Sequence, residues 1–299
     1  MSPVEIGMLS VVAIVVLVYM GLYIPIALGL VSFVSVWIMS GKSILAFNFL
    51  KIAVGDGVTE YNFATIPLFT LMGLLVSKAG LGRDIYDVMN STFRKVLAGI
   101  GMATVGANAV FAAITGSSIA SASVFTKISV PEMLRYNYNK RFAVGVVAGS
   151  SVLGMIIPPS AMLIIYSFIS EQSVGDMFLA GIVPGLLLTG AYIFAIFAMA
   201  RIWPSYIGQD IKADEMPALD TSETIHKAWP VIALIFLVLG GIYTGWLTPV
   251  EAGAAGASLA LVIAALRKSM SWNGLWSTLV ETGHITAAIL LLITMASFY

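Results

Sequence analysis

The chain has 299 residues, of which 59% are hydrophobic and only 10% charged, whereas a soluble domain carries about 25% charged residues. Lys and Arg together number 15, as do Asp and Glu, so the net charge is zero and nothing suggests a nucleic-acid partner. The absence of cysteine excludes disulfides, thiol catalysis and Cys-ligated metal, and the composition as a whole predicts an all-α integral membrane protein.

Several charge-free stretches are long enough to cross the hydrocarbon layer as helices, for which about 20 apolar residues suffice. The N-terminal stretch has Glu5 and no basic residue before its apolar run. A cleaved signal peptide requires a basic start, so we expect a retained first helix with its N-terminus outside. The expected crossings are 6–23, 26–39, 63–79, 142–169, 177–200, 230–246, 252–266 and 285–299.

Three further segments are expected to lie along the membrane surface. Residues 41–62 carry scattered charges and are read as an interfacial segment rather than as a further crossing. Residues 83–95 and 268–281 are amphipathic, and the second contains Trp272 and Trp276. Tryptophan is enriched at the boundary between membrane and water, which agrees with an interfacial position.

Two basic clusters flank an uncharged stretch at 96–126. Short cytoplasmic loops collect Lys and Arg, so both clusters are expected on the cytoplasmic side. A single crossing by the stretch between them would instead place the clusters on opposite sides of the membrane. One straight helix over this stretch would be roughly 46 Å long, against a hydrocarbon core of about 30 Å. Its middle reads Ile114-Thr115-Gly116-Ser117-Ser118, and only protein or water can cover such a polar break. The pattern predicts a re-entrant helical hairpin at 96–126 that enters and leaves on the cytoplasmic side. The clusters are Arg83, Arg94 and Lys95, then Lys127, Arg135, Lys140 and Arg141.

With that hairpin, every basic cluster lies on one side of the membrane. The hydrophilic stretch 201–229 is then expected to be a cytoplasmic linker, because its acidic residues count little in setting orientation. We expect 1–62 to form scaffold helices with the interfacial segment, and 63–200 to form the first half of a transport domain. That half contains the hairpin and a broken helix at 142–169.

An internal repeat is expected at an offset of about 220 residues. GLYIP at Gly21 resembles GIYTG at Gly241, and TIPLFTLMG at Thr65 resembles TAAILLLITMA at Thr286. An odd number of crossings separates the copies, so they would be inverted, as in many secondary transporters. Residues 230–299 would then begin a second repeat, and we expect the chain to be truncated within it. Chance similarity between Leu- and Gly-rich segments is the alternative.

Two polar breaks inside apolar stretches carry the functional argument. The first, AITGSSIASAS at 113–123, is the expected hairpin tip, and the second, AGSSVLGMIIPPSAM at 148–162, has two prolines in mid-span. Proline removes a backbone donor and so frees carbonyls at Gly154 and Met155, which with serine hydroxyls form an oxygen-only cage suited to sodium. Helix N-termini after each break suit a carboxylate. The expected ligands are Thr115, Gly116, Ser117 and Ser118 at the tip, and Ser150, Ser151, Gly154, Pro158, Pro159 and Ser160 on the broken helix.

Plainer explanations compete for each of these residues. Small residues also let helices pack closely, as in the pairs Gly145 with Gly149 and Gly181 with Gly185, although packing alone does not require consecutive prolines. His226 in the linker and His284 at an expected helix start are read as interfacial, and no motif of an intramembrane enzyme is present. Glu251 is expected to cap a helix, and Asp84 and Asp87 to lie on a solvated amphipathic face.

These residues resemble the large membrane subunit of tripartite ATP-independent periplasmic (TRAP) transporters. The Gly-Ser-Ser and Ile-Pro-Pro-Ser motifs in that order make the resemblance to this family specific. The matching stretches span residues 64–257. The matching stretches are ATIPLFTLMGLLVSKAGL, FAAITGSSIASAS, VPEMLRYNYNKRFA, LGMIIPPSAMLIIYS, MFLAGIVPGLLL and GGIYTGWLTPVEAGAAGA.

The resemblance implies a sodium-coupled elevator in the bacterial or archaeal inner membrane that imports organic acids such as C4-dicarboxylates or sialic acid. It implies two partners, a periplasmic substrate-binding protein and a small four-helix membrane subunit, and no cofactor beyond sodium as the coupling ion. By motif, sodium would be held through Gly116, Ser117, Ser118 and Pro158. The alternatives are a dicarboxylate or anion transporter that needs no binding protein, and a purely structural membrane subunit.

Overall fold

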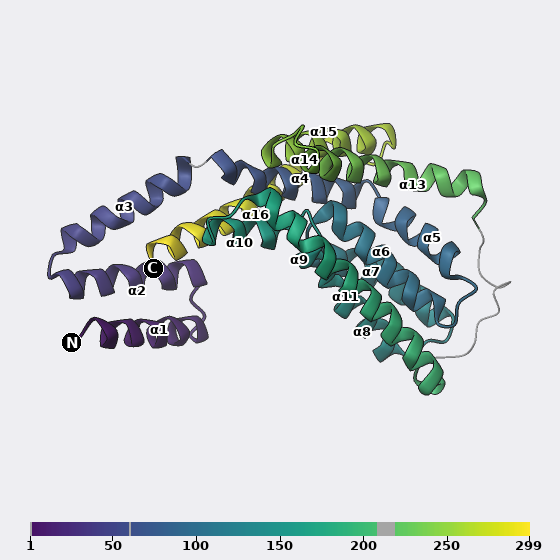
Figure 1. Cartoon of the computed structure of the whole chain (residues 1–299), viewed down its shortest axis with the longest axis horizontal. Coiled ribbons are helices and arrows are strands. Elements are labelled where there is room, and N and C mark those ends of the chain that lie inside the picture. The colour runs from purple at the N-terminus through teal and green to yellow at the C-terminus, as the bar shows by residue number, and fades with distance from the viewer. Residues whose placement is uncertain (1, 60, 208–218) are drawn as a thin grey trace. The chain divides into compact units, whose positions relative to one another are not determined.

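The computed structural model describes residues 2–59, 61–207 and 219–299, and all regular structure in these ranges is helical, which confirms the predicted all-α class (Figure 1). The chain forms two compact units. Unit 1 comprises residues 1–64 and 283–299, and unit 2 comprises residues 65–282.

Unit 1 is built from apolar helices near the N-terminus and the end of the last helix. Ser2 and Glu5 form a reciprocal capping box that starts the first helix, as the sequence of a helix N-terminus requires. The last helix packs against the first two: the Ser10 hydroxyl lies 2.8 Å from the Tyr299 hydroxyl, and a Cβ at Gly29 would lie 2.6 Å from the Met295 sulfur. Its elements are α1 (Pro3–Tyr19), α2 (Ile24–Ser40), α3 (Ser43–Thr59), a 3-10 turn (Tyr61–Ala64) and the end of α16 (Trp272–Phe298).

Unit 2 holds the remaining helices, and its most extensive helix–helix contact joins α4 to α15. Small residues allow this approach, because added Cβ atoms at Gly253 and Gly256 would lie 3.0 Å from Leu68 and 2.4 Å from Met72. Its elements are α4 (Thr65–Lys78), α5 (Leu81–Phe93), α6 (Gly99–Thr115), α7 (Ser118–Arg135), α8 (Lys140–Ser151), α9 (Leu153–Ile156), α10 (Ala161–Ile169), α11 (Val174–Ile202), α12 (Pro204–Ile207), α13 (Thr221–Ile235), a π-helical turn (Phe236–Gly240), α14 (Gly241–Tyr243), α15 (Pro249–Leu266) and the start of α16.

Among the described residues, four helices are long and apolar enough to cross a membrane: α11, α13 with α14, α15 and α16. Two bent pairs extend the number to six if each counts as one span, namely the helices of 61–93, bent by 65°, and those of 140–169, bent by 43°. α1, α2, α6 and the start of α3 are shorter apolar helices. The chain is therefore a multi-pass helical membrane protein, in agreement with the sequence.

Helix ends differ from the expected segment ends in two places. α16 is one continuous helix from Trp272, so the predicted amphipathic segment and the predicted last crossing belong to the same element, and His284 lies within it rather than at its start. The expected linker is also partly helical, since α11 continues to Ile202 and α13 begins at Thr221. Residues 208–218 of that linker lie outside the described ranges.

Helix α5 corrects the expectation of a solvated acidic face. Its amphipathic character is confirmed, with Ile85 and Tyr86 buried. Its carboxylates, however, are partly buried in ion pairs with distant segments: Arg267 donates to Asp84, and the Lys227 ammonium donates to Asp87 over 2.5 Å. These pairs bring the starts of α5 and α13 and the end of α15 to one end of unit 2.

The two segments of the proposed repeat share a local turn geometry. Gly21 and Gly245 both have positive φ, of 92° and 73°, and lie in the turn before a helix with proline in its first turn. Glycine adopts this conformation without the cost that a side chain imposes. The similarity agrees with the expected repeat, which stays a prediction.

Candidate functional site

The predicted hairpin is present as two antiparallel helices, α6 and α7, that lie side by side (Figure 1). Two pairs of residues, each with one residue from each arm, hold the arms together. The Phe111 and Phe125 rings meet edge to face with centroids 5.5 Å apart, and the hydroxyls of Thr104 and Ser129 are hydrogen-bonded. The second arm runs to Arg135, beyond the predicted end at 126.

The hairpin tip is formed by Gly116 and Ser117. Gly116 ends α6 with a φ of 58°, and its amide donates to the Ala112 carbonyl. Ser117 is the N-cap of α7, where its hydroxyl accepts from the Ala120 amide at 3.3 Å. A glycine at the helix C-terminus and a serine at the next N-cap are the residues that such a turn favours.

The predicted broken helix is also present, between α9 and α10. Ile157 is extended, Pro158 and Pro159 follow, and helix resumes after Ser160, the N-cap of α10. Pro159 has no N–H to offer the Met155 carbonyl, and this carbonyl instead accepts from the Ser160 hydroxyl at 2.7 Å.

The tip and the break lie directly against each other. The Ala161 amide donates to the Gly116 carbonyl over 3.3 Å, and a Cβ at Gly116 would lie 2.2 Å from the Pro159 carbonyl oxygen. On the other side, a Cβ at Gly154 would lie 2.7 Å from the Ser117 carbonyl carbon and 2.8 Å from the Ser118 nitrogen. Only glycine permits this backbone contact at both positions.

A third helix, α11, also packs against the break. Added Cβ atoms at Gly181 and Gly185 of α11 would lie 2.6 Å from the Ile156 carbonyl oxygen and 2.6 Å from Ile157, respectively. Close packing of α11 against the break therefore explains why Gly181 and Gly185 are glycines. Gly145 and Gly149 are different, since a Cβ at Gly145 would meet open space.

The arrangement brings four helix ends to one place. The C-terminal ends of α6 and α9 meet the N-terminal ends of α7 and α10 there. Of the polar groups at these ends, the Ala161 amide donates to the Gly116 carbonyl, and the Met155 carbonyl accepts from the Ser160 hydroxyl. Carbonyl oxygens favour a cation and the positive N-terminal dipole ends favour an anion. The polar groups at the contact are backbone groups and serine hydroxyls, and the described residues contain no group of three or more His, Asp or Glu that could hold a metal ion.

The predicted ligands divide into those at the contact and those beside it. Gly116, Ser117, Ser118, Gly154, Pro159 and Ser160 contribute to it directly, with Pro158 buried within the break. Thr115 precedes the tip, and its hydroxyl donates to the Phe111 carbonyl at 2.9 Å. The Ser151 hydroxyl donates to its own helix at Ala148.

Asn108 is a polar residue that the sequence argument did not single out. It is fully buried in α6, and its amide nitrogen donates to the Ser150 hydroxyl over 2.7 Å. Its amide oxygen has no partner among the described residues. An asparagine within the uncharged stretch before the tip is the signal that could have identified it.

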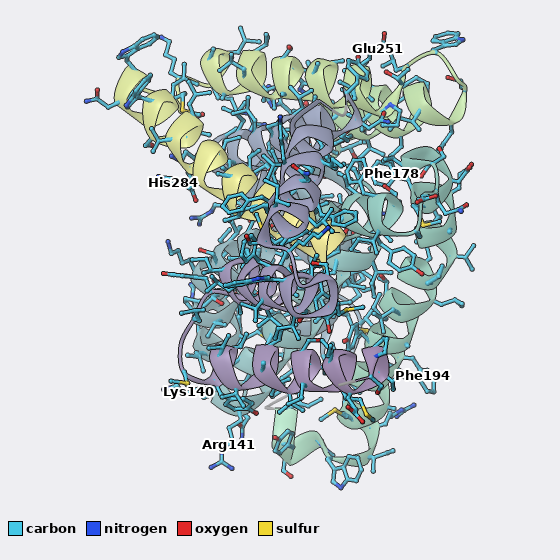
Figure 2. The ribbon with its side chains drawn as sticks, turned by 90° about the vertical axis from the view of Figure 1, so that its left-hand side faces the viewer. Lys140, Arg141, Phe178, Phe194, Glu251 and His284 are labelled. Atoms are coloured by element: carbon cyan, nitrogen blue, oxygen red, sulfur yellow. The ribbon has the colours of Figure 1, made fainter. Side chains whose placement is uncertain are left out.

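The other candidate side chains have structural explanations. Glu251 forms a reciprocal capping box with Thr248 at the start of α15, which confirms its predicted role. His226 and His284 are exposed, and Figure 2 shows His284 projecting from its helix.

Comparison with known proteins gives one family. Residues 11–299 match the family described as "Tripartite ATP-independent periplasmic transporter, DctM component". The C4-dicarboxylate TRAP transporter large permease protein DctM of Pseudomonas aeruginosa is 31% identical over 84% of this chain and 58% of its own length. The isethionate TRAP transporter permease protein DctMQ of Oleidesulfovibrio alaskensis is 28% identical over 92% and 43%, respectively. The sialic acid TRAP transporter large permease protein SiaM of Vibrio cholerae is 27% identical over 82% and 57%. The chain thus spans about half the length of these curated relatives.

Proposed function

Because the chain belongs to the DctM component family of tripartite ATP-independent periplasmic transporters, we propose that it forms the permease of a sodium-coupled importer of organic acids. The full system would include a periplasmic substrate-binding protein and a small four-helix membrane subunit. The acids named for its relatives are C4-dicarboxylates, sialic acid and isethionate, and they define the substrate class that we propose.

The observation that carries this proposal is the contact between the hairpin tip and the broken helix. The Pro159 carbonyl oxygen lies against Gly116 there, 2.2 Å from the position of an added Cβ, and the Gly116 carbonyl accepts from the Ala161 amide. The Ser117 hydroxyl accepts from the Ala120 amide, and the Ser160 hydroxyl donates to the Met155 carbonyl. An oxygen-only ligand set of this kind suits sodium rather than a transition metal. We propose that sodium binds through Gly116, Ser117, Ser118 and Pro158.

Sodium binding would then prepare the site for the acid. A cation among the carbonyls would hold the tip against the break, so that the N-termini of α7 and α10 present their amides to a carboxylate. Ser150, Ser151 and Thr115 would support the wall from the helices on either side. In this scheme the ion and the acid are carried together.

Uptake by proteoliposomes tests the proposal. We would reconstitute the full protein with its small subunit, add the binding protein outside, and measure uptake of radiolabelled acids of the three named classes. The expected result is uptake of one of these acids that requires both an inward sodium gradient and the binding protein. Equal uptake without the binding protein would favour the alternative of an independent anion transporter.

A pair of double variants separates transport from a structural role. Ser117→Ala with Pro158→Ala should raise the sodium concentration needed for half-maximal uptake at least severalfold. The matched control is Ser123→Ala with Pro131→Ala, since both residues lie exposed on α7 away from the tip. If both double variants keep the sodium dependence of the unmodified protein, the sodium site is wrong and a structural subunit is favoured.

A further inference from the structure

A surface groove of about 260 Å³ lies between α8 and α11, apart from the tip and the break. Arg141, Gly145 and Gly149 line it from α8, and Tyr192 and Met199 line it from α11. Tyr206 of α12 completes one end. We call this feature the α8–α11 groove.

The groove runs from a basic end into an apolar interior. Arg141 is in the first turn of α8 and Gly149 is two turns further on, about 12 Å along the axis. A Cβ at Gly145 would meet open space, and the Tyr192 ring closes the floor 3.6 Å from the position of a Cβ at Gly149. The absence of side chains at Gly145 and Gly149 therefore leaves the groove open along this face of α8.

The basic end lies where aromatic residues mark the boundary between membrane and water. α11 ends at Ile202, and α12 turns back so that the Asn139 amide donates to the Ile207 carbonyl over 3.0 Å. This contact places exposed Trp203 and Tyr206 beside the start of α8. Tryptophan and tyrosine are enriched at that depth of the bilayer.

Within the described residues, no side-chain ion pair neutralises the positive charge at this end. Lys140 and Arg141 are exposed, and Figure 2 shows them at one end of the ribbon with Arg141 extending outward. The side-chain ion pairs within the described ranges join Asp84 to Arg267 and Asp87 to Lys227, so neither cation takes part. The N-terminus of α8 adds its positive dipole end.

We propose that the α8–α11 groove binds one anionic phospholipid, with its phosphate at Lys140 and Arg141 and part of one acyl chain along Gly145 and Gly149. Basic pockets between membrane helices bind anionic headgroups, and the apolar interior of this groove suits a hydrocarbon chain. The volume is below the 300 to 1,000 Å³ of a typical small-molecule pocket, which disfavours a soluble ligand. The charge at the mouth selects an anionic lipid over a zwitterionic one.

Native mass spectrometry of the purified full protein in detergent tests this inference with phosphatidylglycerol and phosphatidylethanolamine as probes. We expect one phosphatidylglycerol to bind more tightly than phosphatidylethanolamine. Arg141→Gln should weaken phosphatidylglycerol binding about fivefold, because a basic side chain near the headgroup contributes roughly that factor. Gly145→Leu should abolish the tight binding, since the side chain would fill the open space.

Matched variants outside the groove are the controls. Gly190→Leu makes the same change at a glycine of α11 that also faces open space, and Arg201→Gln removes an exposed arginine near the same end. Both should bind phosphatidylglycerol as the unmodified protein does, and circular dichroism should show all variants folded. Equal binding of the two lipids, or unchanged binding in Gly145→Leu, would overturn the inference. If Arg201→Gln weakens phosphatidylglycerol binding as much as Arg141→Gln does, the inference of a specific site is wrong, and general attraction between the basic end and the anionic lipid explains the binding.

Discussion

Gly116 is the residue on which the contact between tip and break depends most directly. Its φ is positive, and an added methyl group would collide with the Pro159 carbonyl. Gly80 also has positive φ, of 78°, but a Cβ there would meet open space. The two glycines therefore separate the cost of the backbone conformation from the cost of the collision.

We predict that Gly80→Ala lowers the free energy of unfolding by about 1 to 2 kcal/mol, the usual cost of a left-handed residue with a side chain. Gly116→Ala should lower it further, because a backbone atom cannot move aside as a flexible side chain can. Unfolding of the purified protein by sodium dodecyl sulfate titration measures both values. Equal losses in the two variants would mean that the tip does not contact the break.

The hydrogen bond between Asn108 and Ser150 can be tested by substituting each residue. Ser150→Ala leaves the buried Asn108 amide without its acceptor and should cost about 1 to 3 kcal/mol. Asn108→Ala should cost less, about 1 kcal/mol, because the Ser150 hydroxyl keeps its bond to the Val146 carbonyl. The double variant should cost less than the sum, with a coupling of about 0.6 kcal/mol as is typical of helix pairs in membranes. Asn108→Ala with Ser167→Ala is the control and should be additive, since the buried Ser167 hydroxyl donates to its own helix. Additivity in both pairs would contradict the contact.

The residue types of the site were readable from the sequence, whereas their contacts were not. Consecutive prolines and a Gly-Ser-Ser triplet break a helix wherever they occur, so Pro158 and Gly116 could be placed without coordinates. Ser150 was predicted as a ligand on the broken helix, and nothing in the sequence indicated that its hydroxyl accepts from Asn108. Hydrogen-bond partners on different helices depend on helix rotation, which a hydropathy pattern does not fix.

At the scale of elements, the hairpin was predictable because charge and length made a single crossing inconsistent. Helix boundaries were less so. α13 and α16 begin in polar sequence before their apolar runs, at Thr221 and Trp272. A hydropathy pattern detects where a helix enters the hydrocarbon, whereas hydrogen bonding extends the helix into the interface.

The two ion pairs of helix α5 join it to α13 and to the end of α15, which come much later in the chain. We predict that Asp84→Lys lowers the free energy of unfolding by about 1 kcal/mol or more, since a partly buried pair becomes a like-charge contact with Arg267. Exchanging the charges in Asp84→Lys with Arg267→Asp should recover most of this loss. Sodium dodecyl sulfate titration at low and high salt measures it. Failure of the exchange to recover stability would show that the pair has no role in holding α5.

At the scale of the whole molecule, the ion pairs agree with the predicted topology. Asp84, Lys227 and Arg267 come from segments far apart in the chain, and each was assigned to the cytoplasmic side or its linker from the distribution of basic residues. The antiparallel arms of the hairpin likewise bring its flanking residues to one end. Whether that end faces the cytoplasm is a question of insertion, which labelling can answer.

The absence of cysteine makes the chain suited to that experiment, because each introduced thiol is the only one. We predict that Lys95→Cys and Lys140→Cys, on the two sides of the hairpin, react with a membrane-impermeant maleimide only after cells are permeabilised. Ser173→Cys, exposed in the turn before α11, should react in intact cells. The unmodified protein should remain unlabelled throughout. Labelling of Lys95→Cys and Lys140→Cys from opposite sides would mean that the chain makes an odd number of crossings between them, which contradicts a hairpin that enters and leaves on the cytoplasmic side.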